Sequence, residues 1–77
     1  MKYAREDEIV VNGVELYVID ELMYNGEEYM YAQEIVDGDV VGNYHVLNVS
    51  RNMEPIADEN LLKTILSLFV ENIEKDL

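Results

Sequence analysis

The sequence contains no cysteine and no tryptophan, a single proline, a single histidine and only five basic residues among 77. Without cysteine the chain has no disulfide bond, no thiolate zinc ligand and no thiol nucleophile. The longest apolar stretch, Leu61 to Val70, is interrupted by Lys63, Thr64 and Ser67 and is too short to cross a bilayer. Because the first eight residues are rich in acid and include no apolar stretch, we expect no signal peptide and a cytoplasmic protein.

Acidic residues dominate the charge of the chain. Seventeen Asp and Glu residues against five Lys and Arg give a formal net charge of -12. The basic residues are scattered, which is not the pattern of a nucleic-acid-binding surface, and the negative charge repels both nucleic acid and anionic membranes. The apolar share of 49% is typical of a folded protein rather than of a disordered acidic tail. We therefore expect one acidic domain over residues 1–77.

Turn signals divide the first fifty residues into strands. Asn12-Gly13 and Asn25-Gly26 are typical of two-residue hairpin turns, whereas Asp37-Gly38 is expected to open a longer loop that closes near Gly42-Asn43. The runs between these turns predict an antiparallel meander of four strands. The predicted strands are Glu8–Val11, Val14–Tyr24, Glu27–Val36 and Tyr44–Val49.

Pairing across the turns predicts which side chains share a face of the sheet. It sets Val11 opposite Val14, Ile9 opposite Leu16, Leu22 opposite Tyr29 and Leu16 opposite Ile35. The apolar face, expected to be the core side, then carries Ile9, Val11, Val14, Leu16, Val18, Leu22, Tyr29, Tyr31 and Ile35. The reverse face carries Glu15, Tyr17, Ile19, Glu21, Met23, Glu28, Met30 and Glu34. Asp20 falls on the core face, and a β-bulge there or a longer turn around Tyr24–Glu28 would move it out.

The last third of the chain has the period of a helix, with Asp58 as the expected N-cap. The apolar stripe consists of Leu62, Ile65, Leu66, Phe69 and Ile73. The predicted fold is therefore α+β, a four-stranded antiparallel β-meander with one C-terminal amphipathic helix packed on the sheet. The predicted core contains Ile9, Val11, Leu16, Val18, Leu22, Tyr29, Ile35, Val46, Ile56, Leu62, Ile65, Leu66, Phe69 and Ile73.

Three segments together resemble the YrzB-like family, small acidic proteins of low-GC Gram-positive bacteria that form a domain of unknown function. These segments are Glu15 to Glu21, Glu28 to Tyr31, and Met53-Glu54-Pro55-Ile56 leading through Asp58-Glu59 into the terminal helix. The resemblance spans roughly Val11 to Ile73. It implies a small sheet with a C-terminal helix and no particular activity.

No group of residues has the pattern of a catalytic or metal site. His45 lies in a predicted strand with no nucleophile in a recognisable context, so we interpret it as a surface or packing residue. Asp37-Gly38-Asp39 begins like a calcium loop but is followed by Val40 and Val41 rather than further oxygen ligands. Carboxylates adjacent in a strand point to opposite faces and do not form an acid–base pair. We therefore expect no enzyme activity, no metal and no cofactor.

The acidic charge instead predicts a protein-binding module that docks on a basic protein surface. The expected contact residues lie on the reverse face of the sheet and are Glu15, Tyr17, Glu21, Glu28 and Glu34. An alternative is a nucleic-acid mimic from a phage or other mobile element that inhibits a nucleic-acid-binding defence protein, with alternate acidic residues of a strand standing for phosphates. Leu61, Leu68 and Val70 widen the helix stripe, which predicts a weak homodimer through the helix.

Overall fold

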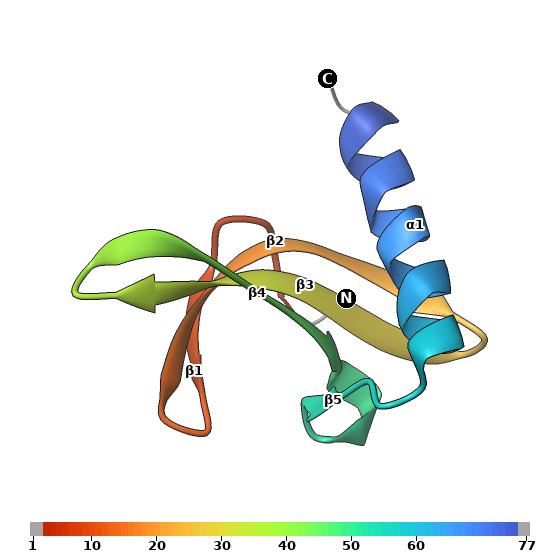
Figure 1. The fold of residues 1–77 in the computed structure, drawn as a ribbon, viewed down its shortest axis with the longest axis horizontal. Coiled ribbons are helices and arrows are strands. Elements are labelled where there is room, and N and C mark those ends of the chain that lie inside the picture. The colour runs from red at the N-terminus through yellow and green to blue at the C-terminus, as the bar shows by residue number, and fades with distance from the viewer. Residues whose placement is uncertain (1–2, 76–77) are drawn as a thin grey trace.

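A computed structural model describes residues 3–75, which form an antiparallel sheet of five strands and one α-helix (Figure 1). The strands lie side by side in chain order: β1 Glu8–Val11, β2 Val14–Tyr24, β3 Glu27–Val36, β4 Asp39–Asn48 and β5 Glu54–Pro55. A short 3₁₀ helix, η1 (Val49–Arg51), joins β4 to β5, and α1 spans Glu59–Lys75. The predicted α+β class is confirmed, with five strands instead of four. No helix in residues 3–75 is long and apolar enough to span a membrane.

All three hairpins turn through two residues. Asn12-Gly13 and Asn25-Gly26 have positive φ at both positions, as a type I′ turn requires. Asp37-Gly38 has the same geometry, with φ of 52° and 82°, so the predicted longer loop is wrong and β4 begins at Asp39. Gly42 and Asn43 lie inside β4, where Val41–Asn43 bulge opposite Glu34 of β3.

A second bulge lies in β2 and divides the sheet into two halves. Val18 pairs with Ala32 and Asp20 pairs with Tyr31, which leaves Ile19 without a partner in β3. Of the two alternatives expected near Asp20, the bulge is present and the longer turn is not. Asp20 nevertheless stays buried. Because one residue of β2 is left out of the pairing, every later side chain of β2 lies on the opposite side of the sheet from the one that regular alternation predicts. The predicted pairing of Leu16 with Ile35 is wrong, since Leu16 lies opposite Glu34.

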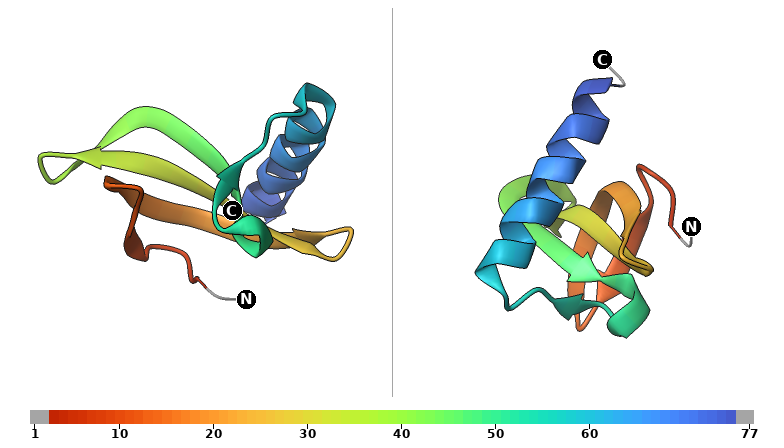
Figure 2. Two further views of the ribbon diagram at one scale, coloured as in Figure 1. Left: turned by 90° about the horizontal axis from the view of Figure 1, so that it is seen from below. Right: turned by 90° about the vertical axis from the view of Figure 1, so that its right-hand side faces the viewer.

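Because of this bulge the sheet has a core on each side. One side carries the half-barrel core, formed by Leu16, Val18, Met30, Ala32 and Leu47. The other side carries the helix-side core, in which Leu22 and Tyr29 pack with Ile65 and Phe69 of α1. The predicted single apolar face is therefore wrong, and Met30, predicted on the reverse face, is fully buried. Figure 2 shows the curved sheet with α1 over one side and the β1–β2 hairpin turned toward the other.

The helix begins where the sequence predicts but is rotated relative to the predicted stripe. Asp58 is the N-cap, and its Oδ1 accepts hydrogen bonds from the backbone N–H groups of Asn60 (2.8 Å) and Leu61 (3.2 Å). Ile65 and Phe69 are fully buried. Leu61 and Leu68 pack against them, and the predicted core residues Leu62 and Leu66 lie on the adjacent side of the helix. All four leucines are half-buried.

Candidate functional site

The five residues predicted to contact a partner do not share one surface. Glu15 and Tyr17 precede the bulge and lie on the side of the sheet that α1 covers. The three remaining residues, Glu21, Glu28 and Glu34, lie on the side of the half-barrel core. Glu21 is also buried, with 4% of its surface exposed, and accepts a hydrogen bond from the backbone N–H of Tyr3 at 2.8 Å. The predicted single acidic face is therefore wrong, because the bulge at Ile19 was not included in its register.

The residues predicted for self-association are also separated. Leu61 and Leu68 pack against the helix-side core and are half-buried. Val70 is 50% exposed. Leu62 and Leu66 are also half-buried and line a depression on the adjacent side of the helix.

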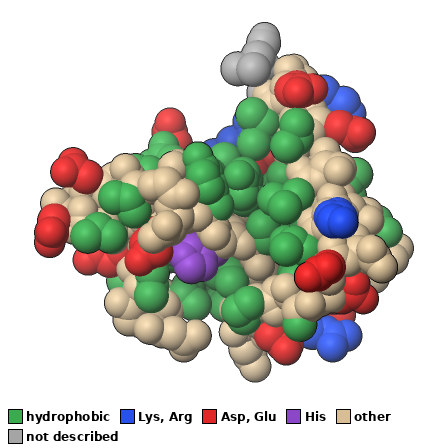
Figure 3. Space-filling model, viewed as in Figure 1, with side chains coloured by type: hydrophobic (Ala, Val, Ile, Leu, Met, Phe, Trp, Pro, Cys, Tyr) green, Lys and Arg blue, Asp and Glu red, His purple; other side chains and the backbone are tan. Residues whose placement is uncertain are grey.

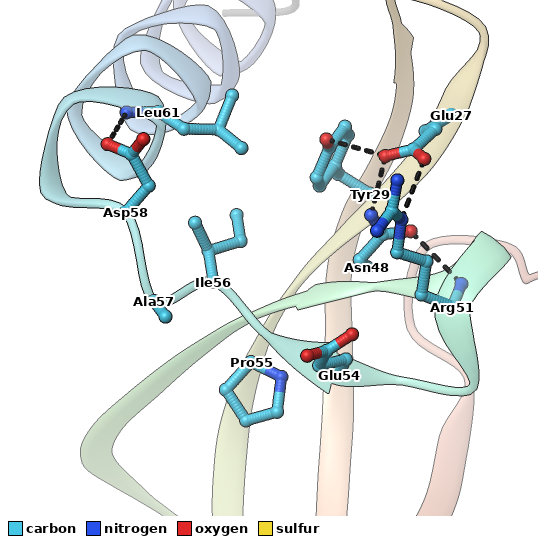
Figure 4. Close-up of a pocket in the computed structure, with 10 residues that line it drawn as sticks. All are labelled: Glu27, Tyr29, Asn48, Arg51, Glu54, Pro55, Ile56, Ala57, Asp58 and Leu61. Atoms are coloured by element: carbon cyan, nitrogen blue, oxygen red, sulfur yellow. Dashed lines mark hydrogen bonds and ion pairs between the residues drawn. The ribbon is translucent and has the colours of Figure 1, made fainter.

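Two depressions lie next to each other on the helix side of the sheet, where β4 and β5 meet the start of α1. The first, here called the polar pocket, has a volume of about 250 Å³ (Figure 4). Its lining consists of Glu27, Tyr29, Asn48, Arg51, Glu54, Pro55, Ile56, Ala57, Asp58 and Leu61. The figure shows Glu27 and its partners on one side of this pocket and the helix start, Asp58 and Leu61, on the other.

Glu27 is the centre of the hydrogen bonds in the polar pocket. Its Oε1 accepts from Nε of Arg51 at 2.8 Å, and its Oε2 accepts from Nδ2 of Asn48 at 2.8 Å and from the Tyr29 hydroxyl at 3.2 Å. Asn48 in turn caps η1, since its Oδ1 accepts from the backbone N–H of Arg51 at 3.2 Å. These contacts join β3, the end of β4 and η1.

Glu27 and Arg51 stabilise each other's charged form. Hydrogen bonds from Arg51 and then from Asn48 hold the pKa of Glu27 below its ordinary value of 4.5. Burial, together with the hydrogen bond to Glu27, raises the pKa of the Tyr29 hydroxyl. Glu27 also raises the pKa of Arg51. Since Glu27 and Arg51 neutralise each other, the carboxylates of Glu54 and Asp58 make the lining negative overall.

The polar pocket presents carboxylates and a single hydroxyl. Its carboxylates accept hydrogen bonds, and the only hydroxyl in its lining, that of Tyr29, donates to Glu27. An ammonium or guanidinium group is the ligand that carboxylates at a negative rim hold best. Within residues 3–75 no three His, Asp or Glu side chains are arranged to hold a metal ion.

The second depression, here called the apolar groove, lies between β4 and α1 and has a volume of about 460 Å³. Its lining consists of Tyr31, Tyr44, His45, Val46, Leu47, Pro55, Ile56, Leu62 and Leu66. Tyr31 stacks on Phe69 of the helix-side core and on Tyr44, with ring centroids 5.4 and 5.5 Å apart. Figure 3 shows a band of apolar side chains between β4 and α1, with the histidine beside it and acidic side chains around the rim.

The two depressions form one composite site because Pro55 and Ile56 line both. Sequence reasoning missed this site. Glu27 and Arg51 are far apart in the chain, and no spacing pattern connects them. The groove has one signal in the sequence, the helix stripe that is wider than a single sheet face needs, but that signal pointed to Leu61 and Leu68 instead of Leu62 and Leu66.

His45 lies at the border of the groove and is paired with an acidic neighbour. Its Nε2 is 3.3 Å from Oε2 of Glu34, and Nδ2 of Asn43 donates to the same oxygen at 3.3 Å. No hydroxyl nucleophile is among these contacts.

Comparison with protein-family models, with curated proteins and with solved structures gave no match to this chain, so the resemblance to the YrzB-like family stays a prediction.

Proposed function

We propose that this chain is a non-catalytic protein-binding module whose ligand is a basic surface of a partner protein. The observation that supports the proposal is the composite site, an open apolar groove that continues into a negative pocket. Apolar contacts supply most of the affinity of a protein interface, and complementary charge supplies specificity and a fast association rate. On a chain with a net charge of -12, both features favour a partner that is apolar at its centre and basic at its edge.

The alternative of a nucleic-acid mimic has less support. A mimic of the phosphate row needs acidic residues at alternate positions along one face of a strand. In β2, Glu15 and Glu21 lie on opposite sides of the sheet, and Glu21 and Asp20 are buried. β2 therefore presents no row of acidic side chains along one face.

A comparison of two charge-matched variants tests the proposed function. Leu66→Glu places a carboxylate in the apolar groove, whereas Ser67→Glu adds the same charge to an exposed position of α1 outside the groove lining. Tagged wild type and both variants are used to capture proteins from a lysate of the organism that carries the gene, at about 0.05 M and about 0.5 M salt. We expect wild type and Ser67→Glu to retain the same basic protein at low salt, and Leu66→Glu to lose it.

Binding of the identified protein is then measured with purified components. Equal affinity for wild type and Leu66→Glu would contradict the proposed site. Failure of wild type to retain any protein at low salt would contradict the proposed function. Circular dichroism of the two variants checks that both remain folded.

A further inference from the structure

The edge of the sheet next to the apolar groove is open. β5 pairs only with Leu47 and Asn48 of β4, and it is the last strand of the sheet. From Asp39 to Val46, the outer edge of β4 therefore has no strand partner within residues 3–75. An unpaired edge presents backbone N–H and C=O groups that can bind another extended chain.

The same residues that form this edge form one wall of the groove. Tyr44 and Val46 lie two residues apart in β4 and line the groove together, opposite Leu62 and Leu66 of α1. The bulge at Val41–Asn43 interrupts the edge, so its regular part beside the groove runs from Tyr44 to Val46. Within it the backbone groups of His45 face β3, and those of Tyr44 and Val46 face outward. A chain paired with this part would direct every second side chain toward α1.

From these two observations we propose that the composite site binds an extended, basic segment of the partner, which adds to β4 as a further strand. This inference rests on the proposed function and specifies how the ligand is held. Backbone hydrogen bonds to β4 would provide affinity, and alternate apolar side chains would enter the groove. The groove volume of about 460 Å³ is within the range of about 300–1,000 Å³ that ligand pockets occupy.

Charge indicates that the segment is basic at its ends. Asp39, the first residue of β4, is exposed at one end of the open edge. Glu54 and Asp58, both exposed, line the polar pocket beyond Pro55 and Ile56 at the other end. A Lys or Arg on either side of an apolar centre would lie close to these carboxylates.

A bound helix and a second copy of this chain fit the site less well. A helix satisfies its own backbone groups, so it would cover the outward-facing backbone groups of Tyr44 without bonding to them. A second copy carries the same charge of -12, and its five basic residues do not occur in one segment. An extended basic segment of another protein therefore remains the best-matched occupant.

A phage-displayed library of random peptides of about ten residues, selected on the wild-type protein, tests the inference. We expect enriched peptides to have apolar residues at every second position with Lys or Arg outside them. They should bind Ser67→Glu as they bind wild type, and Leu66→Glu at least ten-fold more weakly. Enrichment of apolar residues at the three- and four-residue spacing of a helix, or no enrichment, would overturn strand addition.

Backbone methylation of the best peptide separates strand addition from side-chain docking. N-methyl groups on one alternate set of amides remove the donors that face β4, and those on the other set remove donors that face away. We expect one set to weaken binding at least ten-fold and the other to change it little. We also expect the outward-facing amide hydrogens of Tyr44 and Val46 to exchange more slowly in the complex, and that of His45, which faces β3, to change little. Equal effects of both sets would overturn the inference. The proposed function is tested separately. If both methylated sets have equal effects, a basic protein that wild type and Ser67→Glu retain and Leu66→Glu does not retain would still support it.

Discussion

At the scale of single residues, the contacts of Glu27 show how the few basic side chains of this protein are used. The Glu27 side chain contacts Arg51, Asn48 and Tyr29, which come from three different segments. Arg5 has a similar role toward buried Asp20, with Nε and Oδ1 3.2 Å apart. Both arginines thus form an ion pair with an acidic residue of another segment.

The lowered pKa of Glu27 predicts a pH-dependent effect of Glu27→Gln. A carboxylate with a depressed folded-state pKa stabilises the protein above its unfolded pKa, and this contribution is lost as the pH falls through the folded value. Wild type should therefore melt at a higher temperature than Glu27→Gln at pH 7, and the difference should shrink below about pH 4.5. Thermal unfolding between about pH 7 and pH 3 measures this difference.

Glu28→Gln is the matched control for that experiment. Glu28 is the next residue, and the Arg51 ion pair is made by Glu27, not by Glu28. Identical loss of melting temperature in both variants at every pH would show that the pair with Arg51 is not the cause.

The raised pKa of Tyr31 predicts an effect at alkaline pH. Burial, followed by the proximity of Tyr44, raises the pKa of the Tyr31 hydroxyl above its ordinary value of 10.0. The resulting stability is complete below pH 10.0 and is lost as the pH rises toward the folded pKa. Tyr31→Phe keeps the ring and removes the ionising group, so we expect it to lose less stability than wild type above pH 10.0, measured by denaturant unfolding. The same alkaline loss in wild type and Tyr31→Phe would contradict this assignment.

At the scale of elements, the orientation of α1 can be tested by two truncations. Ile65 is fully buried in the helix-side core, whereas Leu62 borders the open groove. Ile65→Ala should reduce the free energy of unfolding by about 2–5 kcal/mol, and Leu62→Ala should cost clearly less. Urea unfolding of both variants measures the losses, and equal losses would mean that α1 lies in the orientation predicted from the sequence stripe.

The elements themselves were largely predictable. Strands β1, β2 and β3 have the predicted bounds. The two Asn-Gly turns mark the end of β1, both ends of β2 and the start of β3, and Asp37-Gly38 marks the end of β3. β4 was predicted to start five residues late, since Gly42 and Asn43 suggest a turn although they form a bulge. The side of each residue after position 19 was not predictable, because alternation alone does not show which residue is left unpaired. The polar pocket was not predictable either, since it depends on contacts between distant segments.

At the scale of the whole molecule, the excess negative charge acts on stability and on binding in opposite directions. Repulsion between carboxylates destabilises the folded state, and added salt screens that repulsion over a Debye length of about 8–10 Å at physiological ionic strength. We therefore expect the melting temperature to rise as NaCl is added, while affinity for a basic partner falls. Calorimetry measures the first effect and titration with the basic peptide the second. A melting temperature that falls with salt would show that internal ion pairs outweigh the repulsion.

The unpaired residue Ile19 also determines which changes in length the chain can accept during evolution. Deletion of this residue would restore uninterrupted pairing between β2 and β3. It would then direct Leu22 and the half of β2 around it toward the half-barrel, away from Ile65 and Phe69. A lineage that lost this codon would need a new apolar surface for its helix, whereas length changes at the hairpin tips would disturb neither core. Genuine relatives should therefore vary in length at the three turns and keep the spacing between Leu16 and Leu22.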